Sequence, residues 1–203
     1  MSIDETRPPR RRRSPEVARA EALVAARRLL LEDGPEAVTL KAVASAIGMS
    51  HPNLIHRFGS ASGLQSALMA DLVSELGAAI RTAAEEWRTS GAGGPSGLME
   101  PVFKAFAEQG AGRLAAWIAL SGDLTHLAPV HAALNELTGT LAEAFGDAPE
   151  VRRNLTHAVF LTTLVAFGDA VIGPPLREML KLKTEAARDD FSEMLFGWVQ
   201  RRS

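Results

Sequence analysis

Two short segments carry side chains suited to contacting nucleic acid. Residues 51–57 read His-Pro-Asn-Leu-Ile-His-Arg, and residues 7–13 hold five arginines and no acid. Imidazole and amide groups can hydrogen-bond to base edges, and guanidinium groups bind phosphate. The plainer alternatives are a short exposed polar helix for the first segment and a solvated, disordered terminus for the second.

The arginine segment is expected to be an extended arm. Pro8 and Pro9 disfavour a helix there, and like charges repel one another along the chain. Such an arm adds salt-dependent phosphate contacts or minor-groove contacts to a neighbouring DNA-binding element. The arm residues expected to touch DNA are Arg10, Arg11, Arg12 and Arg13.

Two short helices joined by a tight turn are predicted to position residues 51–57. Thr39 can cap the first of these helices, and Ser50 can cap the second, which has Pro52 in its first turn. Gly48 suits the turn between them because its conformation penalises a Cβ atom. This is the pattern of a helix-turn-helix motif. Its first helix has apolar residues at helical spacing, namely Leu40, Val43, Ala44 and Ile47.

The second of these helices has one apolar face and one polar face. At about 100° per residue, Leu54 and Phe58 lie within about 40° of each other and define the inward face. His51 stands at the N-terminal end, where recognition helices place their first residues against bases. The outward surface therefore consists of His51, Pro52, Asn53 and His56, followed by Arg57.

The whole chain is predicted to be an all-α protein of about nine helices. Alanine, leucine and glutamate dominate, tyrosine is absent, and no alternating strand pattern persists. Helices are expected at 15–32, 40–47, 51–58, 61–87, 98–109, 111–122, 129–145, 149–172 and 184–201. The clearest internal break is the glycine-rich stretch 90–97, and further breaks are predicted at Gly146–Pro149 and at Gly173-Pro174-Pro175.

Composition excludes several classes of protein. The chain has 203 residues, 46% of them hydrophobic, so it can bury a full core. It has no cysteine, which excludes disulfides, thiolate metal sites and a cysteine nucleophile. No apolar run approaches the roughly 18–20 residues that span a bilayer, and no apolar segment follows the N-terminal arginines as a secretory signal requires. We expect a cytoplasmic protein without a membrane partner.

The formal net charge of −2 is unevenly distributed. Residues 1–67 carry ten basic and seven acidic side chains, a net +3, so the remainder of the chain carries −5. The predicted nucleic-acid contacts therefore lie on a basic part attached to an acidic body, and the whole-chain sum conceals this.

Residues 15–70 resemble the N-terminal region of the TetR family of transcriptional regulators. The similarity rests on Leu29–Gly34, Val38–Ala44, Ile47–Ser50 and Asn53–Phe58, and on Leu64 with Leu68, in the family's order and spacing. It implies an all-helical homodimer whose N-terminal helices bind a palindromic operator and whose C-terminal domain binds a small effector. Typically, such a dimer represses transcription and ligand releases it from DNA.

The resemblance also implies domain bounds and contact residues. It divides the chain into an arm (1–14), a helix-turn-helix domain (15–60) and an effector-binding and dimerisation domain (61–203). It implies DNA contacts from Thr39, at the start of the second helix, and from His51, Pro52, Asn53 and His56. Lys41, Ser50 and Arg57 are expected beside them.

Two positions depart from the family pattern. The family usually has an aromatic residue, often tyrosine, where this chain has Ile55, and often a lysine where it has Ala61. Neither residue present can make the polar contact. Arg57, where the family has an aromatic residue or histidine, and the arginine arm are expected to replace the lost phosphate binding.

The C-terminal half holds many large apolar side chains, which form either core or a pocket lining. In this family part of that core is hollow, and pockets are mostly apolar with few polar groups. Few charges interrupt the central helices, which favours a neutral or lipophilic effector. The expected ligand-binding residues are Trp87, Phe103, Trp117, His126, Thr163, Phe167 and Asp169, although Asp169 equally suits an exposed or interface position.

The last two long helices have wide apolar faces. They pack either within the chain or, as in the family, against a two-fold mate in a four-helix bundle with an isologous interface. Dimerisation is favoured because reading a palindrome requires two recognition helices. The expected interface residues are Val159, Thr163, Ala166, Ala170, Phe191, Leu195 and Trp198.

Other functions fit the sequence less well. No nucleophile elbow, phosphate-binding glycine loop or His-Glu-x-x-His pair is present, so an enzyme is not expected. His126 and His131 are five residues apart and have no evident third ligand, so neither a metal nor a cofactor is expected. The main alternative is a dimeric small-molecule-binding protein with weak or lost DNA recognition. Repression is the expected activity, and activation of transcription is a further alternative that the sequence does not decide.

Overall fold

The computed structural model describes residues 14–122, 128–145 and 148–200, and the regular structure in these ranges is entirely helical. The nine α-helices found there confirm the predicted all-α fold. They are α1 (Pro15–Glu32), α2 (Leu40–Ile47), α3 (His51–Phe58), α4 (Ala61–Ser90), α5 (Gly94–Ala107), α6 (Ala111–Ser121), α7 (Ala128–Phe145), α8 (Pro149–Leu180) and α9 (Thr184–Gln200), with a 3-10 turn, η1 (Pro35–Ala37), between α1 and α2.

Hydroxyl side chains start three of the first four helices, including the predicted cap at Thr39. Ser14, Thr39 and Ser60 each accept a hydrogen bond from the backbone amide three residues further on, at 3.3, 3.1 and 3.0 Å. Each bond satisfies one of the amides left without a partner in the first helical turn. Ser50 is the N-cap residue of α3, but its side chain makes no capping bond.

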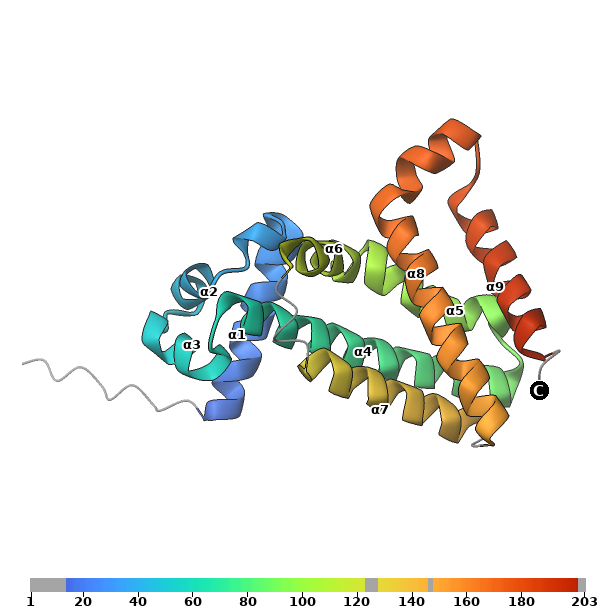
Figure 1. The fold of residues 1–203 in the computed structure, drawn as a ribbon, viewed down its shortest axis with the longest axis horizontal. Coiled ribbons are helices and arrows are strands. Elements are labelled where there is room, and N and C mark those ends of the chain that lie inside the picture. Colours follow the sequence, from blue (N-terminus) through green and yellow to red (C-terminus); the bar gives the residue numbers. More distant parts are fainter. Residues whose placement is uncertain (1–13, 123–127, 146–147, 201–203) are drawn as a thin grey trace, which may run out of the picture.

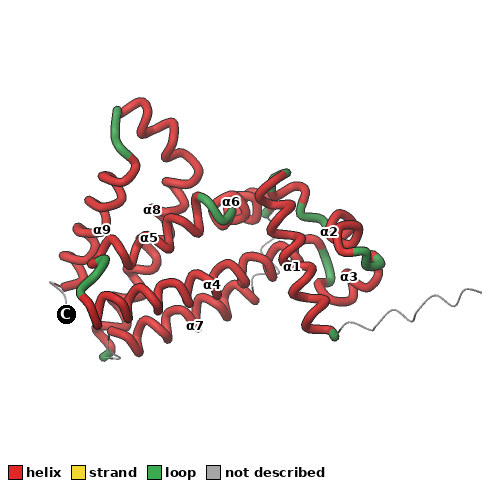
Figure 2. The backbone as a smooth tube through the Cα atoms, turned by 180° about the vertical axis from the view of Figure 1, so that it is seen from behind, coloured by secondary structure: helices red, strands yellow, loops and turns green. Residues whose placement is uncertain are grey.

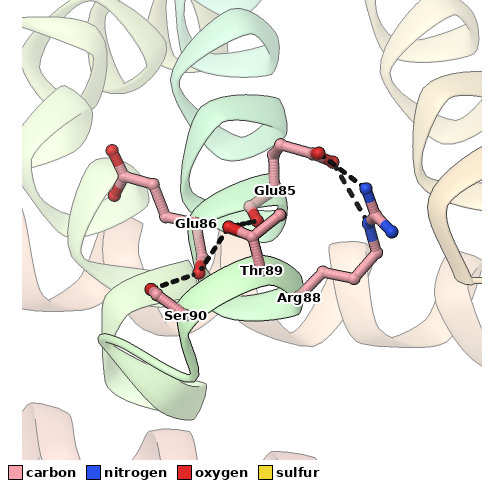
Figure 3. Close-up of polar contacts among 5 residues, drawn as sticks. All are labelled: Glu85, Glu86, Arg88, Thr89 and Ser90. Carbon is pink, nitrogen blue, oxygen red and sulfur yellow. Dashed lines mark hydrogen bonds and ion pairs between the residues drawn. The ribbon is translucent and has the colours of Figure 1, made fainter.

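Local hydrogen bonds close the last turn of α4 (Figure 3). Thr89 Oγ1 donates to the Glu85 carbonyl at 2.8 Å, and Ser90 Oγ donates to the Glu86 carbonyl at 2.7 Å. Arg88 pairs with the Glu85 carboxylate at 2.6 Å, and this hydrogen bond holds the pKa of Glu85 below its usual value. The helix therefore runs three residues beyond its predicted end, and α5 begins at 94 rather than 98.

The molecule has a small head of α1 to α3 at one end (Figure 1). Helix α4 runs from this head along the body, with α7 beside it, and α8 crosses the body on its way to a tip. Seen from behind, the tip formed by the end of α8 and the start of α9 stands clear of the other helices (Figure 2).

Two buried apolar clusters hold these parts together. The first joins α1, η1, α2 and α3 to the first half of α4, and Leu30, Val43 and Leu54 are completely buried in it. Leu114 and Ile118 of α6 belong to the same cluster, and α6 also packs against α5 and α8, so this helix joins the head to the body. The second cluster joins the later part of α4 to α5, α7 and α8.

The predicted break at Gly173-Pro174-Pro175 is wrong, because α8 continues through it to Leu180. The two prolines lack backbone N–H groups and remove hydrogen bonds from this stretch. Helix α8 changes direction in its upper part (Figure 1), as expected where proline interrupts the ladder. The first part of α8 packs against α5 and α7 of the body. Its last part is held by the ion pairs of Asp169 with Arg177 and Arg188.

Candidate functional site

The turn between α2 and α3 has the geometry that the sequence predicts. Gly48 is left-handed, with φ 62° and ψ 34°, and the Met49 amide donates to the Ala44 carbonyl at 2.9 Å. A side chain at position 48 would strain this conformation. The turn ends α2 and sends the chain directly into α3.

Helix α3 presents the predicted polar face to solvent. Leu54 and Phe58 are buried in the first apolar cluster, whereas His51, Pro52, Asn53 and His56 are exposed. Burial of the two apolar side chains fixes the rotation of this short helix about its axis. Thr39, Lys41 and Ser50 are also exposed, close along the chain to this face. Arg10, Arg11, Arg12 and Arg13 lie outside the described residues.

Arg57 ties α3 to the start of α1. Its Nη1 donates to the backbone oxygen of Pro15 at 2.7 Å, so the side chain is half-buried. The guanidinium of Arg19, also on α1, lies 5.1 Å above the Phe58 ring. Both contacts hold α3 in place from α1. The sequence did not indicate this internal partner of Arg57. The same hydrogen bond places Pro15, the first residue of α1, beside α3.

Charged groups connect the head to α4. Arg27 Nη1 donates to Glu75 Oε1 at 2.9 Å, and its other terminal nitrogen reaches the second carboxylate oxygen. This two-point geometry fixes the relative orientation of the groups. Partial burial, and then the charge of Glu75, raise the pKa of the nearby Asp71 carboxyl, against the opposing effect of Arg27 and Arg19.

A cavity of about 340 Å³ lies in the body among α4, α5, α7, α8 and α9. Its lining is apolar apart from Asn154, Thr162, Thr163 and Ser192, and it contains no charged side chain. Helix α8 supplies the longest stretch of wall, from Val151 onwards. The volume is at the lower end of the range for small-molecule sites.

Of the predicted ligand-binding residues, Thr163 lines this cavity. Trp87 lies directly behind the wall, with its ring centroid 4.8 Å from that of the lining residue Phe196. Phe103 is buried in the second apolar cluster outside the lining, and Phe167 is half-buried on α8. Trp117 is exposed on α6. His126 lies outside the described residues.

Asp169 is engaged in a buried ion-pair cluster rather than facing the cavity. It pairs with Arg177 on α8 and with Arg188 on α9, whose Nη2 lies 2.9 Å from Asp169 Oδ2. The Arg188 guanidinium also lies 5.0 Å above the Phe103 ring. Gly173 lies beneath the first pair, and a Cβ there would be 2.5 Å from the Asp169 carboxylate. The cluster joins α8, α9 and α5 beside the cavity.

Most of the predicted interface residues are buried by, or contact, other residues of the same chain. Ala166 is completely buried, Leu195 is nearly so, and Phe191 packs edge-on against Phe103. Val159 and Thr163 line the cavity. Ala170 faces α6, where a Cβ on Gly112 would be 2.7 Å from the Ala170 Cβ, and the rings of Trp198 and His157 are 6.4 Å apart.

The exposed apolar face of α8 lies on the other side of the helix. It includes Phe160, Leu164, Val171 and Ile172, and Met179 continues it towards the tip. Helical spacing groups the first three residues, but the sequence does not show which apolar face turns inward. Sequence reasoning therefore missed this face and selected the stripe of Val159, Thr163, Ala166 and Ala170, which lies roughly 100° away around the helix.

By length and composition, α8 could cross a membrane. It contains an 18-residue window of mean hydropathy 1.7, of which 17% is buried in the structure. The sequence-based statement that no run approaches this length is therefore too strict. Such a single helix is weak evidence for a membrane span, because core and interface helices of water-soluble proteins have the same composition.

Comparison with known proteins finds a family match for the head and the start of α4. Residues 22–68 match the model of the family described as bacterial regulatory proteins, tetR family. A comparison with curated protein sequences finds no match.

Several solved structures share the fold of the whole chain. The TetR family repressor AlkX from Dietzia sp. strain DQ12-45-1b, described as implicated in biodegradation of n-alkanes, is 19% identical, with a TM-score of 0.59 over 93% of this chain and 97% of that one. The fatty acid degradation regulator FadR from Bacillus halodurans is 17% identical, with a TM-score of 0.59 over 92% and 97%. The superantigen PfiT is 19% identical, with a TM-score of 0.58 over 90% and 97%.

Proposed function

We propose that this protein is a ligand-responsive transcriptional repressor, because residues 22–68 match the model of the tetR family of bacterial regulatory proteins and the chain shares the fold of a solved TetR family repressor. It binds a palindromic operator in cytoplasmic DNA as a homodimer, and a small lipophilic effector releases it. The observation that carries this proposal is the combination, in one chain, of an exposed polar face on α3 and an apolar cavity in the body.

Helix α3 is the proposed reader of the operator. Its exposed imidazole and amide groups are of the kind that hydrogen-bond base edges in the major groove. Its buried Leu54 and Phe58, and the contact of Arg57 with α1, keep that face turned outward. The exposed side chains of Thr39, Lys41 and Ser50 are placed to contact phosphate beside it.

A second copy of the chain is the proposed cover of the exposed apolar face of α8. This face includes Phe160, 61% exposed, and Met179, 71% exposed. A two-fold axis would place the same face of both copies in contact and bury it. The same symmetry presents two copies of α3 to two half-sites of a palindrome. The resemblance to the tetR family, which implies a homodimer, and the apolar character of the face support this arrangement.

The base-reading role of α3 can be tested with a matched control. The first step is to select an operator from random duplex DNA with the wild-type dimer and to footprint it. Replacing His51 and Asn53 by alanine should weaken binding by at least about tenfold, since each good base contact contributes roughly 1–3 kcal/mol. Replacing His131 and Asn135, an exposed pair of the same types on α7, should leave it unchanged. If both variants bind the operator with equal affinity, α3 is not the helix that contacts the bases.

The arginine arm is proposed to bind phosphate or the minor groove. Deleting residues 1–13 should weaken binding to all sequences and flatten its dependence on salt, because fewer counterions are released. The measurement is the slope of log affinity against log salt concentration. A slope identical to that of the full-length protein would show that the arm makes no DNA contact.

The second candidate is a dimeric small-molecule-binding protein with weak or lost DNA recognition. Ile55, 43% exposed on the reading helix, and Ala61 at the start of α4 favour it, because neither can donate a hydrogen bond to phosphate. Saturable operator binding by the unliganded dimer at low salt supports the repressor. Its absence, in a dimer that still binds ligand, supports the second candidate.

A further inference from the structure

The chemistry of the cavity wall restricts what it can hold. Helices α4, α5 and α7 contribute only apolar side chains, and the remaining wall belongs to α8 and α9. No lysine, arginine or histidine is among the lining residues, so no cation can neutralise a buried anion. Moving a carboxylate into such a site costs several kcal/mol unless a charged partner accompanies it.

Three of the four polar lining residues are almost completely buried. Asn154 is 1% exposed, Ser192 2% and Thr162 5%. Ser192 Oγ donates its proton to the Arg188 carbonyl at 2.7 Å, so towards a further partner this hydroxyl acts as an acceptor. The contact of Thr162 Oγ1 with Met99 Sδ, at 3.8 Å, is long and weak. These groups are uncharged donors and acceptors that suit a hydroxyl or carbonyl oxygen.

The polar groups also set a length for the occupant. Asn154 and Thr162 are eight residues apart on α8, which corresponds to about 12 Å along the helix axis. Apolar side chains of α7 and α9 line the cavity opposite this stretch, including Leu141 and Phe196. An elongated apolar body with one polar end fits this arrangement.

We propose that the cavity selects an uncharged amphiphile of medium chain length, bearing a hydroxyl or carbonyl oxygen, over a carboxylate with the same carbon skeleton. This inference rests on the proposed function and specifies the class of its effector. The polar end binds at Thr162 or Asn154, and the chain fills the apolar remainder. A fatty acid anion held at the same groups would bury its charge without a counter-ion, because Asn154 and Thr162 are almost completely buried and no lining residue is cationic.

Tryptophan fluorescence provides a direct assay of binding. Trp87 packs against the lining residue Phe196, so an occupant of the cavity changes its surroundings. In a Trp117→Phe/Trp198→Phe protein, Trp87 is the remaining reporter. The probes are 1-octanol, sodium octanoate and n-octane, titrated at pH 8, with calorimetry of the wild-type protein as a second measurement.

At pH 8 we expect 1-octanol to bind at least about tenfold more tightly than octanoate, because only the latter must bury a charge. Between pH 8 and pH 6 the apparent affinity for octanoate should rise about tenfold per pH unit, since the neutral acid is the binding species and its fraction grows in that proportion. The affinity for 1-octanol should not change. Octanoate binding as tightly as 1-octanol at pH 8 would overturn the proposal, as would failure of all three probes to bind.

Substitution of the polar wall tests its part in selection. Thr162→Val keeps the shape of the side chain and removes its hydroxyl, so the preference for 1-octanol over n-octane should fall by about fivefold or more. The matched control is Thr138→Val on α7, a threonine outside the lining whose hydroxyl bonds its own helix. An unchanged preference in both Thr162→Val and Asn154→Leu would overturn the assignment of the polar end.

Operator binding separates this inference from the proposed function. The same protein preparation is tested for saturable binding to its selected operator without any ligand. If it binds DNA but prefers octanoate, the repressor stands and the effector class is wrong. If it binds 1-octanol as expected but no DNA, the effector class stands and the repressor is wrong.

Discussion

Replacing Asp169 by asparagine should destabilise the protein far more than its single change of charge implies. The Asp169 carboxylate is the shared partner of Arg177 and Arg188, and all three side chains are 14–16% exposed. The substitution preserves the shape of the side chain. It leaves two largely buried guanidinium groups facing a neutral amide that offers one acceptor.

The expected loss in free energy of unfolding depends on the two arginine charges that remain without a carboxylate partner. Removing one partner of a buried ion pair costs about 3–5 kcal/mol, because the other charge stays buried without compensation. Residual exposure of the two arginines, and the amide oxygen that still accepts a hydrogen bond, place the expected loss at about 3 kcal/mol. With a urea dependence of roughly 2 kcal/mol per molar, the unfolding midpoint should fall by about 1.5 M.

The assay is equilibrium unfolding in urea at one fixed protein concentration, since the proposed dimerisation would make stability depend on concentration. Glu85→Gln is the matched control, because it makes the same chemical change in the exposed Glu85–Arg88 pair and should not shift the midpoint measurably. A loss below about 1 kcal/mol for Asp169→Asn would refute the reasoning, since it would show that the two arginines find solvent or another partner.

Two further predictions concern α6 and α4. Gly112→Ala should cost about 1–3 kcal/mol, because the new Cβ would be 2.7 Å from the Ala170 Cβ and 2.8 Å from the Phe106 carbonyl oxygen. Gly139→Ala, on a helix with open space, should instead stabilise by about 0.5–1 kcal/mol, and equal effects in urea unfolding would contradict this. The raised pKa of Asp71 means that the folded state holds its proton more tightly, so stability falls as pH rises from 3.8 through the raised value. Asp71→Asn should therefore be more stable than wild type at pH 7, with a difference that shrinks at pH 4, and a less stable variant at pH 7 would contradict the assignment.

The sequence by itself determined the helices and the reading face of α3. Caps at Ser14, Thr39 and Ser60, and the turn at Gly48, are set by neighbours within a few residues, so they can be recognised without the fold. The faces of α3 follow from its helical period, because Leu54 and Phe58 stand one turn apart on the same side of this short helix. Local chemistry therefore accounts for both the elements and the proposed DNA-binding residues of the head.

Only the tertiary structure decided which apolar residues of the body line the cavity, pack in the core or face solvent. Whether an apolar residue of α8 lines the cavity, packs in the core or faces solvent depends on which helices lie against it. This is why Ala166 is buried and Phe160 exposed within the chain. Likewise, Asp169 is paired with α9 because that helix brings Arg188 to it. Pro174 stays within α8, and Arg177 after it pairs back with Asp169 before it. The sequence specified which surfaces are apolar, but the packing of five helices decided which of them enclose a cavity.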